Sequence, residues 1–120
     1  MREPWKNETH ERMIRAFLDI LILVKLEHKS MNGYEITAFI IKKFGITIST
    51  SVVYSTLYSM ERDGLVKGDC NRRGRVYELT SKGNKTLENV QDELEQIQFF
   101  INKLLSKRQN AELKDTSLFS

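Results

Sequence analysis

One stretch, residues 49–78, constrains the fold of this chain more than any other. It predicts a short helix, a break at a glycine, and two strands that flank an arginine-rich turn. Val53, Leu57 and Met60 recur at spacings of four and three residues, which gives the helix one apolar side. Gly74 is free to adopt a positive φ in the turn of the hairpin. A helix followed by a basic hairpin is the layout of a winged helix-turn-helix.

Size and composition are those of one soluble globular domain. The chain has 120 residues, of which 40% are hydrophobic and 29% charged, which excludes wholesale disorder. The net charge of +3 is too small to indicate a nucleic-acid partner by itself. The longest apolar-rich run, residues 16–26, is shorter than the roughly 20 residues that span a bilayer. We therefore expect a cytoplasmic protein with no membrane partner.

Turn and capping signals, among them Gly45 as a helix C-cap and Thr80 as the N-cap of the last helix, divide the chain into four parts. We expect a flexible N-terminal arm at 1–8, a winged helix-turn-helix domain at 9–80, a C-terminal dimerisation helix at 81–106 and a disordered tail at 107–120. The elements expected within the domain are helices at 10–27, 34–44 and from residue 49 or 50 onward, and strands at 65–70 and 75–79. The fold class is mainly α, with three helices and a two-stranded β wing before the long C-terminal helix.

The polar side of the third helix is the first candidate binding surface. Its hydroxyls and one cation fall at helical spacing, in the set Ser51, Ser55, Tyr58 and Arg62, with Tyr54 at the border. The major groove of B-DNA admits a helix, and amides at a helix N-terminus, here near Ser49 and Thr50, attract phosphate. A water-exposed face of a small helix explains the same pattern, because only Arg62 could read a base with two hydrogen bonds.

The turn between the two strands is the second candidate. It places Arg72, Arg73 and Arg75 within five residues. Like charges this close repel one another, and a phosphate backbone or a narrow minor groove would offset that repulsion. The alternative is a solvated turn on a basic protein.

The last helix carries an apolar repeat typical of a helix–helix interface. Six residues recur at spacings of three and four, namely Leu87, Val90, Leu94, Ile97, Ile101 and Leu104. A helix over 81–106 is about 39 Å long at 1.5 Å per residue, more than a small winged helix can cover. We therefore expect a homodimer, and the alternative is that the helix packs on its own domain.

Signals of catalysis are absent from the sequence. There is no glycine-rich phosphate loop and no nucleophile elbow, and two histidines with one cysteine give no metal-site spacing. Cys70 falls in an expected strand, where a buried, inert thiol is the simplest interpretation. We expect no enzyme, no metal and no cofactor.

Five motifs in order resemble the PadR family of transcriptional regulators. They are LDILIL at 18–23, GYEI at 33–36, FGITIS at 44–49, VVYSTLYSMERDGLV at 52–66 and GRVYELTSKG at 74–83. The resemblance covers residues 15–105, and the single long terminal helix is similar to the smaller PadR subfamily. Two positions depart from the family pattern: Asn32 stands where a histidine is usual, and Ser55 where a proline is usual.

The resemblance implies a homodimeric repressor that binds double-stranded DNA at a palindromic operator. With the polar helix face and the basic turn, it gives an expected DNA-binding set of Tyr34, Ser49, Thr50, Ser51, Tyr54, Ser55, Tyr58, Arg72, Arg73 and Arg75. The family's terminal helix packs on the partner's first helix, so the expected dimer interface adds Leu18 and Ile22 to the heptad residues Leu87, Val90, Leu94, Ile97, Ile101 and Leu104.

Two alternatives stay open. Some family members release DNA on binding aromatic compounds, and a small aromatic effector could lie among Trp5, Phe17, Phe99 and Phe100, although ordinary aromatic packing is the commoner reason for such residues. The rival function is a winged-helix protein-interaction or chromatin-like module that does not read DNA sequence.

Overall fold

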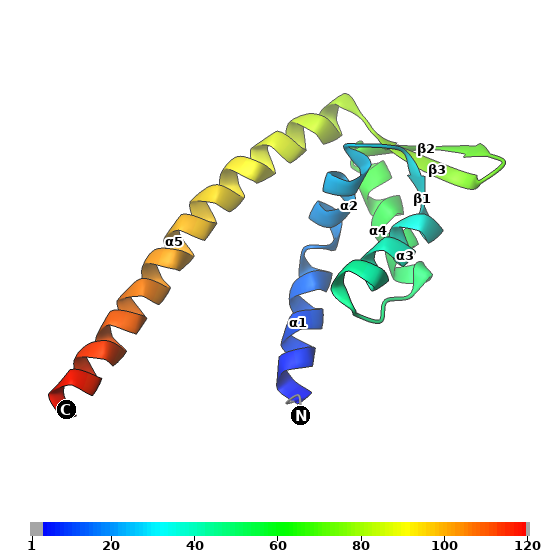
Figure 1. Cartoon of the computed structure of the whole chain (residues 1–120). Coiled ribbons are helices and arrows are strands. Elements are labelled where there is room, and N and C mark those ends of the chain that lie inside the picture. The colour runs from blue at the N-terminus through cyan, green and yellow to red at the C-terminus, as the bar shows by residue number, and fades with distance from the viewer. Residues whose placement is uncertain (1–3, 120) are drawn as a thin grey trace. The chain divides into compact units, whose positions relative to one another are not determined.

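The structure is a computed structural model that describes the backbone of residues 4–119 and the side chains of residues 8–108. Its elements, in chain order, are α1 (Pro4–Ala16), α2 (Leu18–Leu26), β1 (Met31–Asn32), α3 (Gly33–Phe44), α4 (Thr50–Arg62), β2 (Val66–Asn71), β3 (Gly74–Leu79) and α5 (Ser81–Phe119) (Figure 1). The chain divides into two compact units, Met1–Leu87 and Glu88–Ser120, which are described separately. The predicted winged-helix fold is confirmed.

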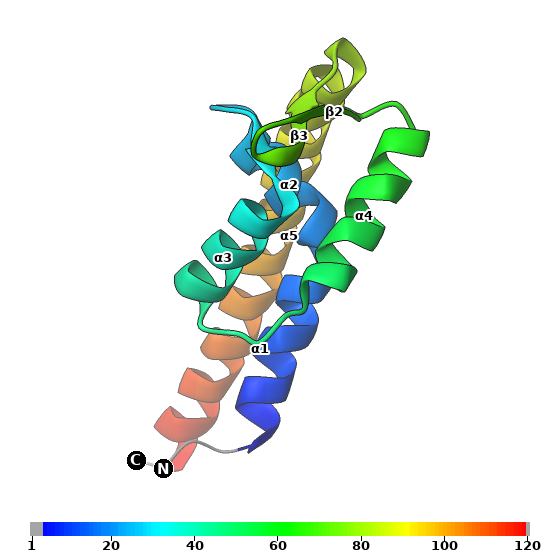
Figure 2. The same ribbon diagram turned by 90° about the vertical axis from the view of Figure 1, so that its right-hand side faces the viewer.

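The core of the first unit forms between the apolar faces of α2, α3 and α4. Ile22 of α2, Ile36 of α3 and Leu57 of α4 have at most 1% of their surface exposed. The spacing that predicted an apolar side for α4 is confirmed, since Val53 and Met60 are buried with Leu57. Residues 45–49 join α3 to α4 (Figure 2).

The sheet has three antiparallel strands in the order β1-β3-β2, one more than the predicted hairpin. β1 is two residues long and pairs Met31 with Tyr77 and Asn32 with Val76. A strand this short carries no alternation of apolar and polar residues, so the sequence gives no signal for it. β2 and β3 pair from Val66↔Leu79 to Asn71↔Gly74, and their far end projects beyond the helices of this unit (Figure 1).

Side-chain caps fix the start of α3 and of α5. Asn32 caps α3 in a reciprocal capping box, in which its side chain accepts from the Glu35 amide and the Glu35 carboxylate accepts from the Asn32 amide. Gly45 ends α3 in the left-handed conformation at φ 64°. The Thr80 hydroxyl accepts from the amide of Gly83 at 3.0 Å and so caps α5 as expected.

The first helix differs from the prediction in two ways. It begins at Pro4, inside the expected arm, because proline is well suited to the first position of a helix. It is also interrupted at Phe17, whose amide is shared between the carbonyls of Met13 and Ile14 at 3.2 Å each. No glycine or proline marks this break, so the sequence predicts one helix where the structure has two.

The last helix also extends further than expected. α5 continues to Phe119, where we expected a tail without regular structure from residue 107. The periodic apolar signal ends near Leu104, but residues 107–114 include Lys, Arg, Gln, Ala, Glu and Leu, which have high helix propensity. Helix propensity and apolar periodicity are therefore separate signals, and only the second one predicts packing. The boundaries of the four predicted segments stay a prediction.

Candidate nucleic-acid interface

The hydroxyl-bearing side of α4 faces solvent. Ser49 is the N-cap, and its Oγ accepts from the amide of Val52 at 3.3 Å and lies 3.1 Å from the Oγ of Ser51. Ser51, Ser55 and Tyr58 are all exposed, whereas the opposite side of the helix is in the core. The helix therefore presents short hydrogen-bonding groups outward.

An open groove of about 510 Å³ runs along this side of α4. Arg62 supplies its only cation, at the C-terminal end, and the lining residues are Thr50, Ser51, Tyr54, Ser55, Tyr58 and Arg62. Five of these six belong to the predicted DNA-binding set, so the structure brings the α4 part of that set together on one continuous surface. Arg62 shares their face of the helix, as its spacing indicated.

Tyr54 links this surface to the start of α3. A methyl group on Gly33 would come within 2.5 Å of Cε1 and Cζ of the Tyr54 ring, so only glycine leaves room for the ring there. The ring of Tyr58 is tilted by 35° to that of Tyr54, with the centroids 6.1 Å apart. Tyr34 follows Gly33 and is 70% exposed. Two tyrosines and the N-terminus of α3 thus adjoin the groove.

Arg73 of the wing is paired with the start of α3. Its Nη2 donates to Oε1 of Glu35 at 2.9 Å and to the carbonyl of Ser30 at 3.4 Å. In return, Nδ2 of Asn32 donates to the carbonyl of Arg73 at 2.9 Å. The residue that stands at the usual histidine position therefore ties the wing turn to α3.

Arg75 is paired with the last turn of α4. Its Nη2 lies 2.9 Å from Oε1 and 2.7 Å from Oε2 of Glu61, and Oε2 also accepts from the amide of Gly68 at 3.0 Å. A side chain on Gly68 would collide with the guanidinium, since a Cβ would lie 2.6 Å from Nε of Arg75. The guanidinium also lies over the ring of Tyr77, 5.7 Å from its centroid. One carboxylate therefore joins α4 to both strands of the wing.

These pairs shift the titration of the groups involved. Hydrogen bonds from Arg75 and from the Gly68 amide lower the pKa of Glu61 below its ordinary value. The hydrogen bond from the Asn32 amide, with the charge of Arg73, lowers the pKa of Glu35. Burial raises the pKa of Tyr77, whose hydroxyl has no hydrogen-bond partner among the described residues.

Arg72 differs from its two neighbours. Its side chain is exposed at the tip of the wing, and within residues 8–108 it takes part in no ion pair or hydrogen bond. The three arginines that the sequence places together are thus divided by the structure into two that hold the wing and one that is free to meet an outside anion. Sequence reasoning missed the two acidic partners because Glu35 and Glu61 lie 38 and 14 residues from the arginines they pair with.

Cys70 corrects another expectation. It is exposed rather than buried, because the far end of the β2–β3 hairpin is covered on neither face. Among the described residues no three His, Cys, Asp or Glu side chains are close enough to hold a metal ion. No helix in the described part of the chain is long and apolar enough to cross a membrane.

The residues predicted for a dimer interface fall into two groups. Leu18, Ile22 and Leu87 are at most 4% exposed because they lie in the core of this chain, and their place in a dimer interface stays a prediction. The later heptad residues are different. Ile97, Ile101 and Leu104 are each about half exposed, at 46–50%, while Val90 and Leu94 are half-buried.

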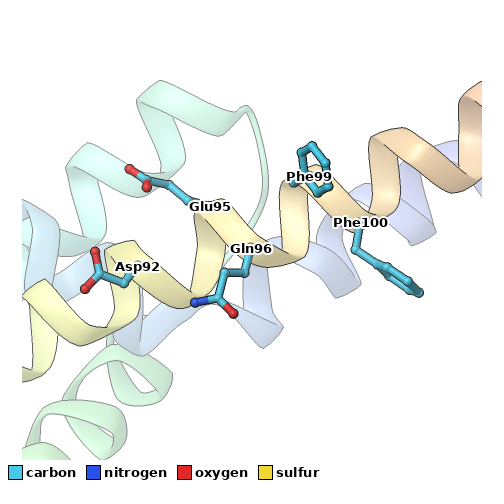
Figure 3. Close-up of a pocket in the computed structure, with 5 residues that line it drawn as sticks. All are labelled: Asp92, Glu95, Gln96, Phe99 and Phe100. Carbon is cyan, nitrogen blue, oxygen red and sulfur yellow. The ribbon is translucent and has the colours of Figure 1, made fainter.

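The aromatic residues predicted for an effector are not gathered within one unit. Phe99 and Phe100 of α5 point away from each other, beside Asp92, Glu95 and Gln96 (Figure 3). Phe17 belongs to the other unit and is 42% exposed, and the side chain of Trp5 lies outside the described residues. The effector site stays a prediction.

The lowered pKa values of Glu35 and Glu61 predict an acid-sensitive stability. A group with a lowered pKa in the folded state stabilises the fold above its unfolded pKa, and this contribution is lost as the pH falls through the folded pKa. A Glu35→Gln/Glu61→Gln variant should be less stable than the wild type at neutral pH, and the difference should shrink at about pH 3. Urea denaturation at both pH values measures it, and a difference that does not change with pH would contradict the assignment.

Comparison with known proteins agrees with this architecture. The model of the PadR-like transcriptional regulator family matches residues 22–89, more than half of the chain. A PadR family transcription regulator from Clostridium difficile is 32% identical, with a TM-score of 0.65 over 74% of this chain and 98% of that one. A transcriptional regulator from Clostridium thermocellum is 29% identical, with a TM-score of 0.69 over 77% and 93%.

A more distant structure shares the fold. Bacillus subtilis PadR, solved in complex with operator DNA, is 23% identical, with a TM-score of 0.56 over 60% of this chain and 45% of that one. The search of curated proteins gives no significant match. With the winged helix, the outward hydroxyl face of α4 and the matched family model all in agreement, the chain belongs to the PadR-like family of transcriptional regulators.

Proposed function

We propose that this chain is a sequence-specific DNA-binding regulator that acts in the cytoplasm as a homodimeric repressor at a palindromic operator. The observation that supports it most is the groove along α4, whose hydroxyls and rings face outward while Val53, Leu57 and Met60 anchor the helix from behind. A helix held by one side and polar on the other can enter a major groove without losing its packing.

The proposed contacts are mostly to phosphates and to DNA shape. The N-terminal hydroxyls Ser49, Thr50 and Ser51 lie where helix amides also attract phosphate. Exposed Tyr34 follows Gly33, which lies against the Tyr54 ring of the groove. Ser55 and Tyr58 lie further along the groove, where Arg62 is the one side chain with the paired donors that read guanine. The choice of operator would then depend in part on how readily the DNA duplex of that sequence deforms.

The operator complex of Bacillus subtilis PadR supports DNA as the partner, since the two chains share the fold.

At the wing, Arg72 is proposed to meet the phosphate backbone. Arg73 and Arg75 are 53% and 38% exposed in their side chains, but each already has a carboxylate partner. Any contact they make with DNA would therefore be shared with Glu35 or Glu61.

The proposed dimer uses the exposed part of the α5 repeat. Ile97, Ile101, Leu104 and Leu105 are each 46–50% exposed. Covering the exposed half of each in both chains is worth roughly 6–12 kcal/mol, at about 1.5–3 kcal/mol for a fully buried side chain. The cost of association is about 4–15 kcal/mol, so this surface can hold two chains when neighbouring apolar groups join it. Two recognition helices would then meet half-sites about 34 Å apart.

A small aromatic effector is a further part of the proposal. Phe99 and Phe100 are 71% and 61% exposed, and Asp92 and Glu95 lie beside them. Exposed rings next to carboxylates are suited to a flat, positively charged compound. Such a ligand would act on the proposed dimer helix and so on the spacing of the two DNA-binding surfaces.

A gel-shift titration tests the function. With duplex DNA from upstream of its own gene, the protein should form a complex that persists at moderate salt and in an excess of random competitor duplex. The proposal would be contradicted if random duplex displaced the labelled DNA as readily as unlabelled upstream duplex does. That result would favour a chromatin-like or protein-interaction role.

The same titration, repeated over a range of salt, tests the wing tip. Arg72→Ala should weaken binding to every duplex and reduce the slope of log K against log salt concentration by ~1, because one phosphate contact is lost. Arg12→Ala is the matched control, since Arg12 is an exposed arginine on α1, outside α4 and the wing. An equal change of slope in both variants would mean that only net charge matters.

Sedimentation velocity tests the dimer. Replacing both Ile97 and Ile101 with glutamate should convert the protein to monomer, because four charges would be placed in one apolar interface. Phe99→Glu is the control, since Phe99 is the most exposed of these apolar residues but lies outside the heptad positions. A double variant that still sediments as a dimer would place the interface elsewhere.

A further inference from the structure

The two ion pairs of the wing have a common arrangement. Each joins an arginine of the hairpin to a glutamate of one helix of the helix-turn-helix: Arg73 to Glu35 of α3, and Arg75 to Glu61 of α4. No other Arg–Glu or Lys–Glu ion pair joins two residues of the range 8–107. The ion pairs formed by arginine and lysine in this part of the chain are therefore concentrated where the wing meets the two helices.

The Glu61 contact is the more specific of the two. Both carboxylate oxygens accept from one guanidinium nitrogen at 2.7–2.9 Å, and Oε2 accepts a third hydrogen bond from the Gly68 amide of the neighbouring strand. The side chains are only partly exposed, at 38% for Arg75 and 28% for Glu61, so water screens the pair less than a surface pair. The carboxylate is thus fixed from two strands at once.

Glu61 also has an unfavourable position for a DNA-binding surface. It precedes Arg62, which lines the groove of α4, and it stands one turn after Tyr58. A carboxylate there repels phosphate, so on simple electrostatic grounds its removal should strengthen DNA binding. A residue that instead orients the wing should show the opposite sign.

We propose that Glu61 is a positioning residue for DNA binding: through Arg75 and the Gly68 amide it fixes the wing against the recognition helix α4. Glu35 does the same for α3 through Arg73, and the phosphate contact of the wing passes to Arg72. The inference rests on the proposed DNA-binding function. It assigns Arg73 and Arg75 to orientation of the wing, although the sequence alone predicts all three arginines as candidates for contact with DNA.

The test compares Glu61→Gln with Glu78→Gln in the salt titration with the upstream duplex. Glu78 is an exposed glutamate of β3, so its variant removes the same charge near the wing without removing the Arg75 contact. Glu78→Gln should leave binding unchanged or slightly stronger, whereas Glu61→Gln should weaken it by roughly tenfold at an unchanged salt slope. Stronger binding by Glu61→Gln, equal to that of the control, would overturn the proposal.

Arg75→Lys provides a second variant that keeps the charge. Lysine keeps the charge but lacks the planar guanidinium that lies over the Tyr77 ring and against Gly68, so it should hold Glu61 less firmly, while it serves nearly as well as a single phosphate contact. Positioning predicts a loss of affinity similar to that of Glu61→Gln. Wild-type affinity in Arg75→Lys would mean that the charge of Arg75 acts on DNA directly. Thermal unfolding of each variant confirms that it is folded at the assay temperature.

Amide hydrogen exchange without DNA separates failure of this inference from failure of the proposed function. The amides of β2 and β3 should exchange roughly tenfold faster in Glu61→Gln than in Glu78→Gln, because the hairpin opens locally when its contact with α4 is lost. Faster exchange in a protein that binds no specific DNA would support the positioning role of Glu61 and reject the proposed DNA-binding function. Unchanged exchange in a protein that does bind specific DNA would reject only the positioning role.

Discussion

The burial of one side of α4 is the contact on which the rest of the structure depends. Val53 and Leu57 have none of their surface exposed, and Met60 has 3%. Because a helix turns once every 3.6 residues, fixing these three positions directs Ser51, Ser55 and Tyr58 outward. The same packing that stabilises the first unit therefore also directs the hydroxyl side chains of α4 toward solvent.

Apolar packing and charge together determine where the wing lies. Val66, Val76 and Tyr77 are buried and hold the near part of the hairpin, whereas β2 is mostly exposed beyond Val66. Two arginine–glutamate pairs and the amide of Gly68 hold it against the helices of the domain. This explains why the basic turn contributes fewer free charges than its sequence indicates, and why Arg72 alone of the three arginines lacks a partner in the described part of the chain.

The sequence predicted the features that have a local period or a local turn: the apolar side of α4, the two strands of the wing and the caps at Gly45 and Thr80. It did not predict features that depend on distant residues or on weak local signals, such as the pairs that bind Arg73 and Arg75, the two-residue β1 or the break at Phe17. The family resemblance implied Leu18 and Ile22 for the dimer interface. Both side chains lie in the core of the first unit, which only the packing of the helices could show.

The most direct measurement of the central claim is an NMR titration of the isotope-labelled protein with duplex DNA from upstream of its gene. The account predicts that the largest amide shifts fall on the outward positions of α4, on Tyr34 and on Arg72, while the amides of buried Val53 and Leu57 shift less. Shifts concentrated on the α5 residues from Ile97 to Leu105, with α4 unchanged, would contradict a DNA-reading role for the hydroxyl face.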